Sequence, residues 1–340
     1  MNEPLTDVRQ ISHIAYGFMA SKALFAALNV ELFGHLDKGA RDIEALAGAT
    51  GMTPQGLETL LASLLSLGLL VRDGDDYANA PATASYLVPG AKAYFGDYYR
   101  FQIDRQVYPN FIHLDAGLAG NEEGLAHDSF SGWVEDAQMA ADFSRAQHAG
   151  SLGPALMMSD RIDLSGRRRL LDVAGGTGAY SITFCRRQAE LVATIIDFPS
   201  VIEVAKGYVT AAGLEDRITL QAGDALAEEW PGNQDVVLMS YFLSAVGGGD
   251  IETLLGRAWQ ALAPGGRLIV HDFMLDDDRA GPAQAAAWFL VYLPLRTDAV
   301  SFSAAELEPL IAGHGFEGIQ DQVMIPEITK VITAEKPGTG

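Results

Sequence analysis

The chain has 340 residues, of which 49% are hydrophobic and 20% charged, a balance typical of globular proteins that excludes an intrinsically disordered chain. The formal net charge of −21 disfavours a nucleic-acid partner, because phosphate contacts require a basic face. The single cysteine, Cys185, excludes an internal disulfide and is typical of a reducing cytosol. The sequence has no recognisable signal peptide and no apolar run of membrane-spanning length. We therefore expect a cytoplasmic protein without a membrane partner.

The first 90 residues have the pattern of a small helical domain. Apolar residues recur at helical spacing over 11–28, with few polar residues between them. We therefore expect this helix to be buried against another surface, most naturally that of a partner subunit. Helical patterns over 42–47 and 54–67 and a hairpin over 69–77 complete a winged-helix arrangement. DNA binding is disfavoured because the helix over 54–67 carries Glu58 and no Lys or Arg.

A helical connector rich in aromatic and polar side chains follows over 91–150. Ligand sites favour domain junctions, so we expect this connector to cap a substrate site. The sequence therefore predicts three parts: a winged-helix-like dimerisation domain over 1–90, the capping connector over 91–150, and a cofactor-binding domain over 151–340.

The most informative stretch is 170–181, which reads Leu-Leu-Asp-Val-Ala-Gly-Gly-Thr-Gly-Ala-Tyr-Ser. An apolar strand ending in an acid, a glycine-rich turn and a helix start are typical of a nucleotide-binding βαβ unit. A dinucleotide fingerprint needs glycine at the sixth position, but counting from Gly176 that position is Ser181. Asp172 would also repel phosphate, whereas its carboxylate can bind the amino-acid ammonium of S-adenosylmethionine.

Two more expected strands end in acids. The segment 194–199 contains Asp197, which can accept hydrogen bonds from ribose hydroxyls, and the segment 218–225 contains Asp224, which can take an adenine amino group. Three such acids beside one glycine turn favour a cofactor site over ordinary solvated strand ends.

Strand patterns near residues 170, 193, 218, 236 and 268 alternate with helical patterns. This alternation predicts an α/β fold with a doubly wound, mainly parallel, Rossmann-like sheet. Segments 322–324 and 329–334 are expected to add a final antiparallel pair.

Four motifs behind a winged-helix N-terminus resemble a known family: Asp172-Val-Ala-Gly-Gly-Thr-Gly, Asp197-Phe-Pro, Gly223-Asp224 and Ala263-Pro-Gly-Gly-Arg. They are similar to the S-adenosylmethionine-dependent small-molecule O-methyltransferases of the caffeate and acetylserotonin type. The resemblance covers nearly the whole chain. It implies a methyltransferase fold, S-adenosylmethionine as cofactor, a small-molecule substrate, a homodimer formed through the N-terminal domain, and no metal.

The resemblance also implies a set of cofactor-binding residues. Ala225 replaces a bulky residue of the family, Ser240 replaces a lysine, and Ala174 replaces the first glycine of the motif. The expected cofactor-binding residues are Phe143, Asp172, Gly175, Gly176, Gly178, Asp197, Phe198, Asp224, Ala225 and Ser240.

The most consequential departure lies at 243–246, where Leu-Ser-Ala-Val stands in place of the family's Leu-His-Asp-Trp. The family's histidine deprotonates the acceptor hydroxyl, but Ser244 has no useful basicity at neutral pH. We therefore expect an acceptor that needs no deprotonation, such as a thioether. The runs 8–22 and 240–244 further resemble the bacterial S-methyltransferases of dimethylsulfoniopropionate synthesis, which implies conversion of 4-methylthio-2-hydroxybutyrate to 4-dimethylsulfonio-2-hydroxybutyrate.

Such a substrate calls for an arginine fork for its carboxylate and aromatic faces for the product cation. The candidate substrate-binding residues are Tyr98, Arg100, Arg105, Tyr108, Trp133, Arg145, Gln147, Ser244, Trp288 and Tyr292. Two alternatives remain open. One is O-methylation with His148 or His271 as a relocated catalytic base, and the other is a non-catalytic, cofactor-binding dimer.

Overall fold

A computed structural model describes residues 4–39, 41–126, 132–134 and 136–338. The chain divides into two compact units at Tyr108 and Pro109, and each unit is described by itself. The connector expected over 91–150 is therefore divided between the two units, and it does not form a separate body.

The N-terminal unit is helical with one small hairpin. Its elements are α1 (Val8–Asn29), α2 (Leu32–Asp37), α3 (Ile43–Thr50), α4 (Pro54–Ser66), β1 (Leu70–Asp73), β2 (Asp76–Asn79), α5 (Pro81–Tyr86) and the π-helix η1 (Tyr98–Val107). Thr53 caps α4 by accepting from the Gly56 amide, and Pro54 occupies the first turn. The expected helix pair and hairpin are confirmed.

Helix α1 is long and strongly apolar, but most of it is not covered within its own unit. Val8 and Ile14 are 72% and 71% exposed, and burial is confined to the last turns, which contain Phe25, Ala27 and Leu28. Among the described residues, α1 alone meets the length and composition of a membrane-crossing helix, a test that other apolar helices also pass. An exposed apolar face of this size marks an interaction surface.

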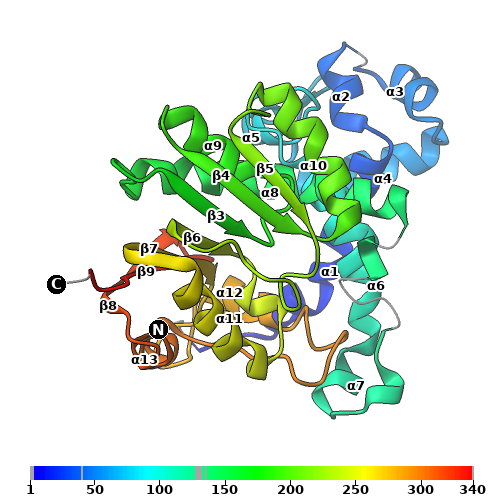
Figure 1. Cartoon of the computed structure of the whole chain (residues 1–340). Coiled ribbons are helices and arrows are strands. Elements are labelled where there is room, and N and C mark those ends of the chain that lie inside the picture. Colours follow the sequence, from blue (N-terminus) through cyan, green and yellow to red (C-terminus); the bar gives the residue numbers. More distant parts are fainter. Residues whose placement is uncertain (1–3, 40, 127–131, 135, 339–340) are drawn as a thin grey trace. The chain divides into compact units, whose positions relative to one another are not determined.

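The C-terminal unit is a seven-stranded sheet with helices on both faces (Figure 1). Its strands are β3 (Arg169–Val173), β4 (Val192–Asp197), β5 (Ile218–Ala222), β6 (Gln234–Ser240), β7 (Leu262–Phe273), β8 (Glu317–Ile325) and β9 (Thr329–Glu335). The short helix α6 (Tyr108–Asn110) begins at the last residue of the N-terminal unit. The helices of the C-terminal unit are η2 (Phe111–His113), α7 (Leu114–Leu118), η3 (Glu122–Gly124), η4 (Gly132–Val134), α8 (Ala137–Arg161), α9 (Ala179–Arg187), α10 (Pro199–Ala212), η5 (Leu243–Ala245), α11 (Gly248–Ala261), α12 (Ala283–Phe289) and α13 (Ala304–Gly313).

The strand order is β5-β4-β3-β6-β7-β9-β8, and the first five strands are parallel. Strands β8 and β9 form the expected antiparallel pair. Strand β7 begins at Leu262, earlier than expected, because Leu262 already pairs with Gln234 before a register shift. The order reverses between β3 and β6, so the carboxyl ends of the central strands open a crevice of the kind that binds ligands in this fold.

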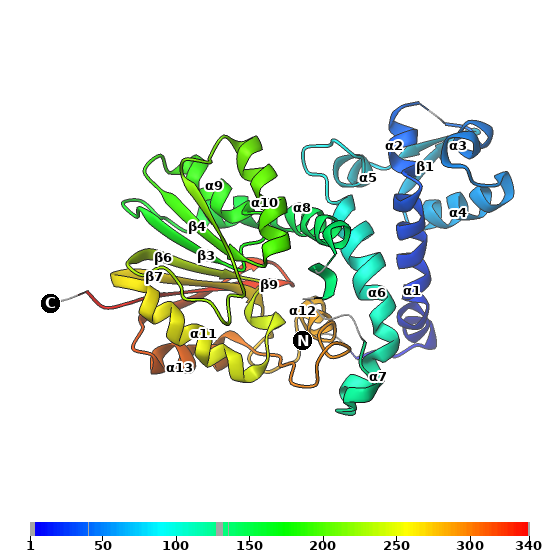
Figure 2. The same ribbon diagram turned by 45° about the vertical axis from the view of Figure 1, so that its right-hand side comes forward.

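Alternation along the strands builds one core on each face of the sheet. Leu171 and Val237 pack in one apolar cluster with α11 and α13, whereas Leu170 and Val236 pack in the other with α8, α9 and α10. Figure 2 shows the same two helical layers from a turned view.

Candidate functional site

The glycine turn between β3 and α9 fits very little besides glycine. A Cβ on Gly175 would lie 2.6 Å from the carboxylate carbon of Asp172. Gly178 has φ +80, and a Cβ there would lie 2.6 Å from Cδ1 of Ile195. Ala174 has φ +53, so it holds a left-handed conformation that strains an alanine. The turn therefore lies directly against the strand-end acid.

Asp172 is fully buried at the end of β3. Its Oδ2 accepts a 2.7 Å hydrogen bond from Ser181, while Oδ1 has no partner among the described residues. Burial raises the pKa of this carboxyl to about 7. A buried carboxylate oxygen without a donor is unfavourable, so Oδ1 is able to accept a hydrogen bond from a cationic donor such as an ammonium group.

The other two acids lie at the ends of the neighbouring strands. Asp197 accepts hydrogen bonds from the amides of Gly176 (2.8 Å) and Phe198 (2.7 Å), and burial raises the pKa of its carboxyl to about 6. The amide of Gly223 donates to the Asp197 carbonyl, which ties the segment carrying Asp224 to the end of β4. The structure thus brings all three acids to one edge of the sheet.

The remaining expected cofactor residues differ in their surroundings. Phe143 and Phe198 join one apolar cluster with Val134, Ala140 and Val201. Ala225 is buried in the core of the α11 face, so its side chain packs inward.

Ser244 belongs to a chain of hydrogen bonds that reaches a carboxylate. Its hydroxyl donates to Oδ1 of Asp272 (2.6 Å) and its amide donates to Oδ2 (3.0 Å). The Tyr292 hydroxyl lies 3.0 Å from the Ser244 hydroxyl and accepts a hydrogen bond from Nε1 of Trp288. Trp288 also stacks on Phe273 with 4.7 Å between ring centroids.

Asp272 is a candidate functional residue that the sequence did not single out. It is 1% exposed, and burial raises the pKa of its carboxyl to about 6. Its position in the sequence indicates this placement. Asp272 follows His271 on β7, and His271 pairs with Ser240 on β6, the strand that leads to Ser244.

Burial weakens the basicity of both histidines that the sequence offers as a relocated base. Nδ1 of His148 lies 2.8 Å from the Thr177 hydroxyl, its ring stacks on Tyr208 at 4.0 Å, and burial lowers its pKa to about 4. His271 is completely buried, and burial lowers its pKa to about 3.

The ring nitrogens of His271 are occupied by hydroxyls of the fold. Nδ1 contacts Ser240 (2.9 Å) and Tyr180 (3.1 Å), and Nε2 contacts Thr329 (2.9 Å). The His271 side chain is thus enclosed between neighbouring elements, and its role as a catalytic base stays a prediction. His148 instead connects α8 to the glycine turn.

Comparison with known protein families matches two parts of the chain. Residues 12–89 match the O-methyltransferase dimerisation domain, and residues 121–317 match the O-methyltransferase domain. The chain belongs to the O-methyltransferase family. The resemblance read from the four motifs is thereby confirmed.

The names of the relatives of this methyltransferase specify different methylated atoms, oxygen in one case and carbon in another. The 3-hydroxy-5-methyl-1-naphthoate 3-O-methyltransferase of Streptomyces sahachiroi is 31% identical over 277 residues, 81% of this chain and 80% of that protein. The L-tyrosine C(3)-methyltransferase of Streptomyces lavendulae is 26% identical over 319 residues, 91% of this chain and 87% of its own. The structure of human N-acetylserotonin methyltransferase with S-adenosylmethionine superposes with a TM-score of 0.86 at 24% identity, covering 100% of both chains, which confirms the fold class.

Four of the expected substrate residues of the methyltransferase lie in its N-terminal unit. There Arg100 contacts Glu31 at 3.4 Å, and the Arg105 guanidinium lies 4.7 Å from the ring centroid of Phe101. Tyr98 and Tyr108 belong to the same unit. Their part in substrate binding stays a prediction.

The other expected substrate residues lie in the C-terminal unit. Trp133 is buried, with its ring 6.2 Å from that of Phe143. Arg145 and Gln147 lie on α8 beside His148, Arg145 exposed and Gln147 half-buried. Within the part of the chain that the structure describes, no group of three His, Cys, Asp or Glu side chains has the arrangement of a metal site.

Proposed function

We propose that the chain is a cytoplasmic homodimeric methyltransferase that uses S-adenosylmethionine and methylates a neutral nucleophile, the thioether sulfur of a small acid such as 4-methylthio-2-hydroxybutyrate. The observation that carries the proposal is the serine at position 244, together with the weak basicity of both nearby histidines. The match to the dimerisation domain and the exposed apolar face of α1 support the homodimer.

The strand-end acids fit the cofactor. In this proposal Oδ1 of Asp172, which has no partner among the described residues, accepts from the ammonium group, Asp197 accepts from ribose hydroxyls, and Asp224 accepts from the adenine amino group. S-adenosylmethionine, when bound, supplies a methyl group on a positively charged sulfur. The close packing of Gly175 against Asp172 keeps the backbone of the turn close to that ligand.

The acceptor follows from the missing base. A hydroxyl must lose its proton as it attacks, and general-base catalysis of that step is typically worth about 10² to 10⁴-fold. A thioether attacks with a lone pair and releases no proton. Catalysis by this chain is then orientation of the acceptor, which can contribute roughly 7 to 11 kcal/mol.

The Asp272 carboxylate has a role in this reaction that is electrostatic. Methyl transfer moves the positive charge from the donor sulfur to the acceptor sulfur. A buried carboxylate hydrogen-bonded to Ser244 favours positive charge on the acceptor side, since charge interactions are strong in a site that excludes water. The aromatic face of Trp288 adds to the same effect.

O-methylation is the second candidate, and two observations favour it. One is the 31% identity to an O-methyltransferase. The other is the Ser244 and Asp272 pair, in which Ser244 passes its proton to the carboxylate while it takes one from an acceptor hydroxyl.

The test is incubation of the purified protein with methyl-labelled S-adenosylmethionine and a panel of thioethers, phenols, alcohols and amines, with products identified by mass spectrometry. The proposal expects label in a thioether. Label only in hydroxyl compounds would support the second candidate. Binding of S-adenosylhomocysteine without any labelled product would indicate a non-catalytic, cofactor-binding dimer.

A further inference from the structure

The segment 224–230, after β5, carries two of the expected cofactor-binding residues, Asp224 and Ala225. It forms a single helical turn, because the amides of Ala227 and Glu228 both donate to the Asp224 carbonyl. One isolated turn is unstable on its own, since helix nucleation fixes several residues for one hydrogen bond. Its conformation therefore depends on contacts from outside the turn.

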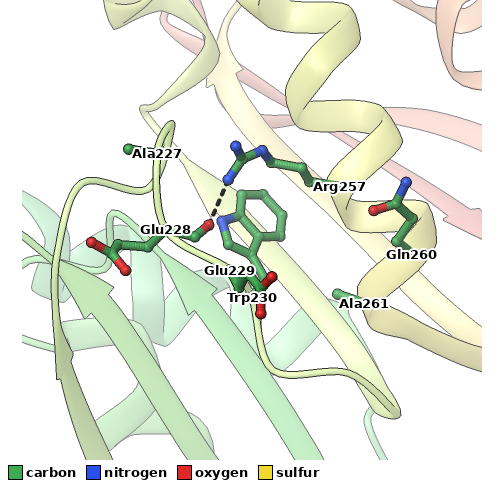
Figure 3. A pocket seen from close by; sticks show the side chains of 7 residues that line it. All are labelled: Ala227, Glu228, Glu229, Trp230, Arg257, Gln260 and Ala261. Atoms are coloured by element: carbon green, nitrogen blue, oxygen red, sulfur yellow. Dashed lines mark hydrogen bonds between the residues drawn. The ribbon is translucent and has the colours of Figure 1, made fainter.

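Those contacts come mainly from Arg257 on α11. Nη1 of Arg257 donates to the carbonyls of Glu228 (2.5 Å) and Ala225 (3.3 Å). Figure 3 shows the guanidinium directed at the Glu228 carbonyl, with Trp230 beside it. A cation at the carboxyl end of a helical turn satisfies carbonyls that have no partner within the turn.

Two neutral side chains complete the support. Nε1 of Trp230 donates to the Ala225 carbonyl (2.9 Å), and Nε2 of Gln221 donates to the Glu229 carbonyl (3.1 Å). Within the turn, the Leu226 amide donates to Oδ1 of Asp224 and orients that carboxylate. We therefore expect the hydrogen bonds to these carbonyls to hold the turn, and with it the orientation of the Asp224 carboxylate.

We propose that Arg257 is a positioning residue for the methyl donor, which holds the turn so that Asp224 is presented to the 6-amino group of adenine. This rests on the proposed use of S-adenosylmethionine. Arg257 acts through the backbone of the turn and does not touch the ligand. Its loss is expected to weaken donor binding and to reduce discrimination between adenine and a base that lacks the amino group.

The experiment is calorimetric titration of the full chain with S-adenosylhomocysteine and with S-inosylhomocysteine, in which hypoxanthine replaces adenine. Arg257→Ala is expected to weaken binding of S-adenosylhomocysteine about tenfold, the size of one lost hydrogen bond to a charged group. It is also expected to lower the preference for adenine, as Asp224→Asn should. Arg257→Lys should recover part of both effects. Gln260→Ala changes an exposed residue that lines the same surface hollow as Arg257 and Trp230, and it should bind like the original chain.

Trp230→Phe provides a second variant if Arg257→Ala does not fold, because it removes one hydrogen bond to Ala225 and keeps an aromatic ring. Unchanged affinity in folded Arg257 variants would overturn the inference, as would weakened affinity with an unchanged adenine preference. Failure of the original chain to bind S-adenosylhomocysteine would instead overturn the proposed function, on which the inference rests.

Discussion

The Ser244 hydroxyl lies 2.6 Å from Oδ1 of Asp272, and it is the donor in that hydrogen bond. A serine has one hydroxyl proton, so the contact with Tyr292 must be donated by the tyrosine, which in turn accepts from Trp288. The bonds therefore run in one direction, from Trp288 through Tyr292 and Ser244 to the carboxylate. An ionised Asp272 is the acceptor that completes this order.

Asp272→Asn tests the role of that charge. Burial raises the pKa of Asp272 to about 6, so the original enzyme should lose kcat/KM as the pH falls through about 6 and the carboxylate is neutralised. The variant should be about 10² times slower at pH 7.5, and the decline attributable to this group should be absent. The measurement is a kcat/KM profile from pH 5 to 8, and a variant with the original profile would contradict this role.

Ser244→Ala separates the two candidate reactions. Thioether methylation needs no proton transfer and should fall by about tenfold or less, reflecting only the altered hydrogen bonds around Asp272 and Tyr292. Methylation of a hydroxyl through a serine relay should fall by about 10² or more. Steady-state kinetics with one acceptor of each kind decides between them. Ser165→Ala controls for loss of a hydroxyl, because Ser165 is exposed and its hydroxyl also donates to a carboxylate, that of Asp163.

Asp172→Asn should separate stability from binding. Burial raises the pKa of Asp172 from an ordinary 3.8 to about 7, so the folded chain holds a proton that the unfolded chain has lost. This group therefore favours folding at low pH, and its contribution is lost as the pH rises through about 7. At pH 8 the variant should unfold at a higher temperature than the original chain.

The same variant should bind S-adenosylhomocysteine about 10 to 100 times more weakly, the effect of losing a charged partner for the ammonium group. Calorimetry at pH 8 measures this loss. An unchanged affinity would show that Oδ1 of Asp172 does not face the ligand.

His148→Ala tests whether this residue holds the glycine turn or takes a proton. The hydrogen bond to Thr177 predicts a raised KM for S-adenosylmethionine with a smaller change in kcat, and His148→Asn should recover part of the loss. A catalytic base would give the opposite split. It would also give a fall in rate at acidic pH, where the imidazole is protonated, and both variants would remove that limb.

Stability provides an independent check on His148. Burial lowers its pKa from 6.5 to about 4, so between these values the unfolded chain binds a proton that the folded chain does not. The free energy of unfolding should therefore fall as the pH drops from 6.5 toward 4, and His148→Asn should reduce that slope. Denaturant titrations at pH 7.5 and 5 measure the difference.

The sheet and its strand-end acids were predictable from the sequence. Parallel strands separated by helices place their carboxyl ends at one edge, so Asp172, Asp197 and Asp224 had to meet there once the alternation was recognised. The glycine turn was equally local, because strand, turn and helix are contiguous.

Contacts between distant segments were not predictable. The bond from His148 to Thr177 joins α8 to a turn 29 residues away, and the one from Ser244 to Asp272 spans 28 residues. Neither contact produces a periodic pattern in the sequence that would reveal it. His148 is therefore judged by its side-chain chemistry alone, which makes it a candidate base. Only the packing shows that burial depresses its pKa and that Thr177 occupies Nδ1.

The most direct test of methyl transfer without deprotonation uses 4-methylthio-2-hydroxybutyrate, which carries a thioether and a hydroxyl in one molecule. Both acceptor atoms are then offered at the same concentration, and fragmentation of the labelled product locates the methyl group. The account predicts label on sulfur, giving a dimethylsulfonium cation. Label on the hydroxyl oxygen would contradict it.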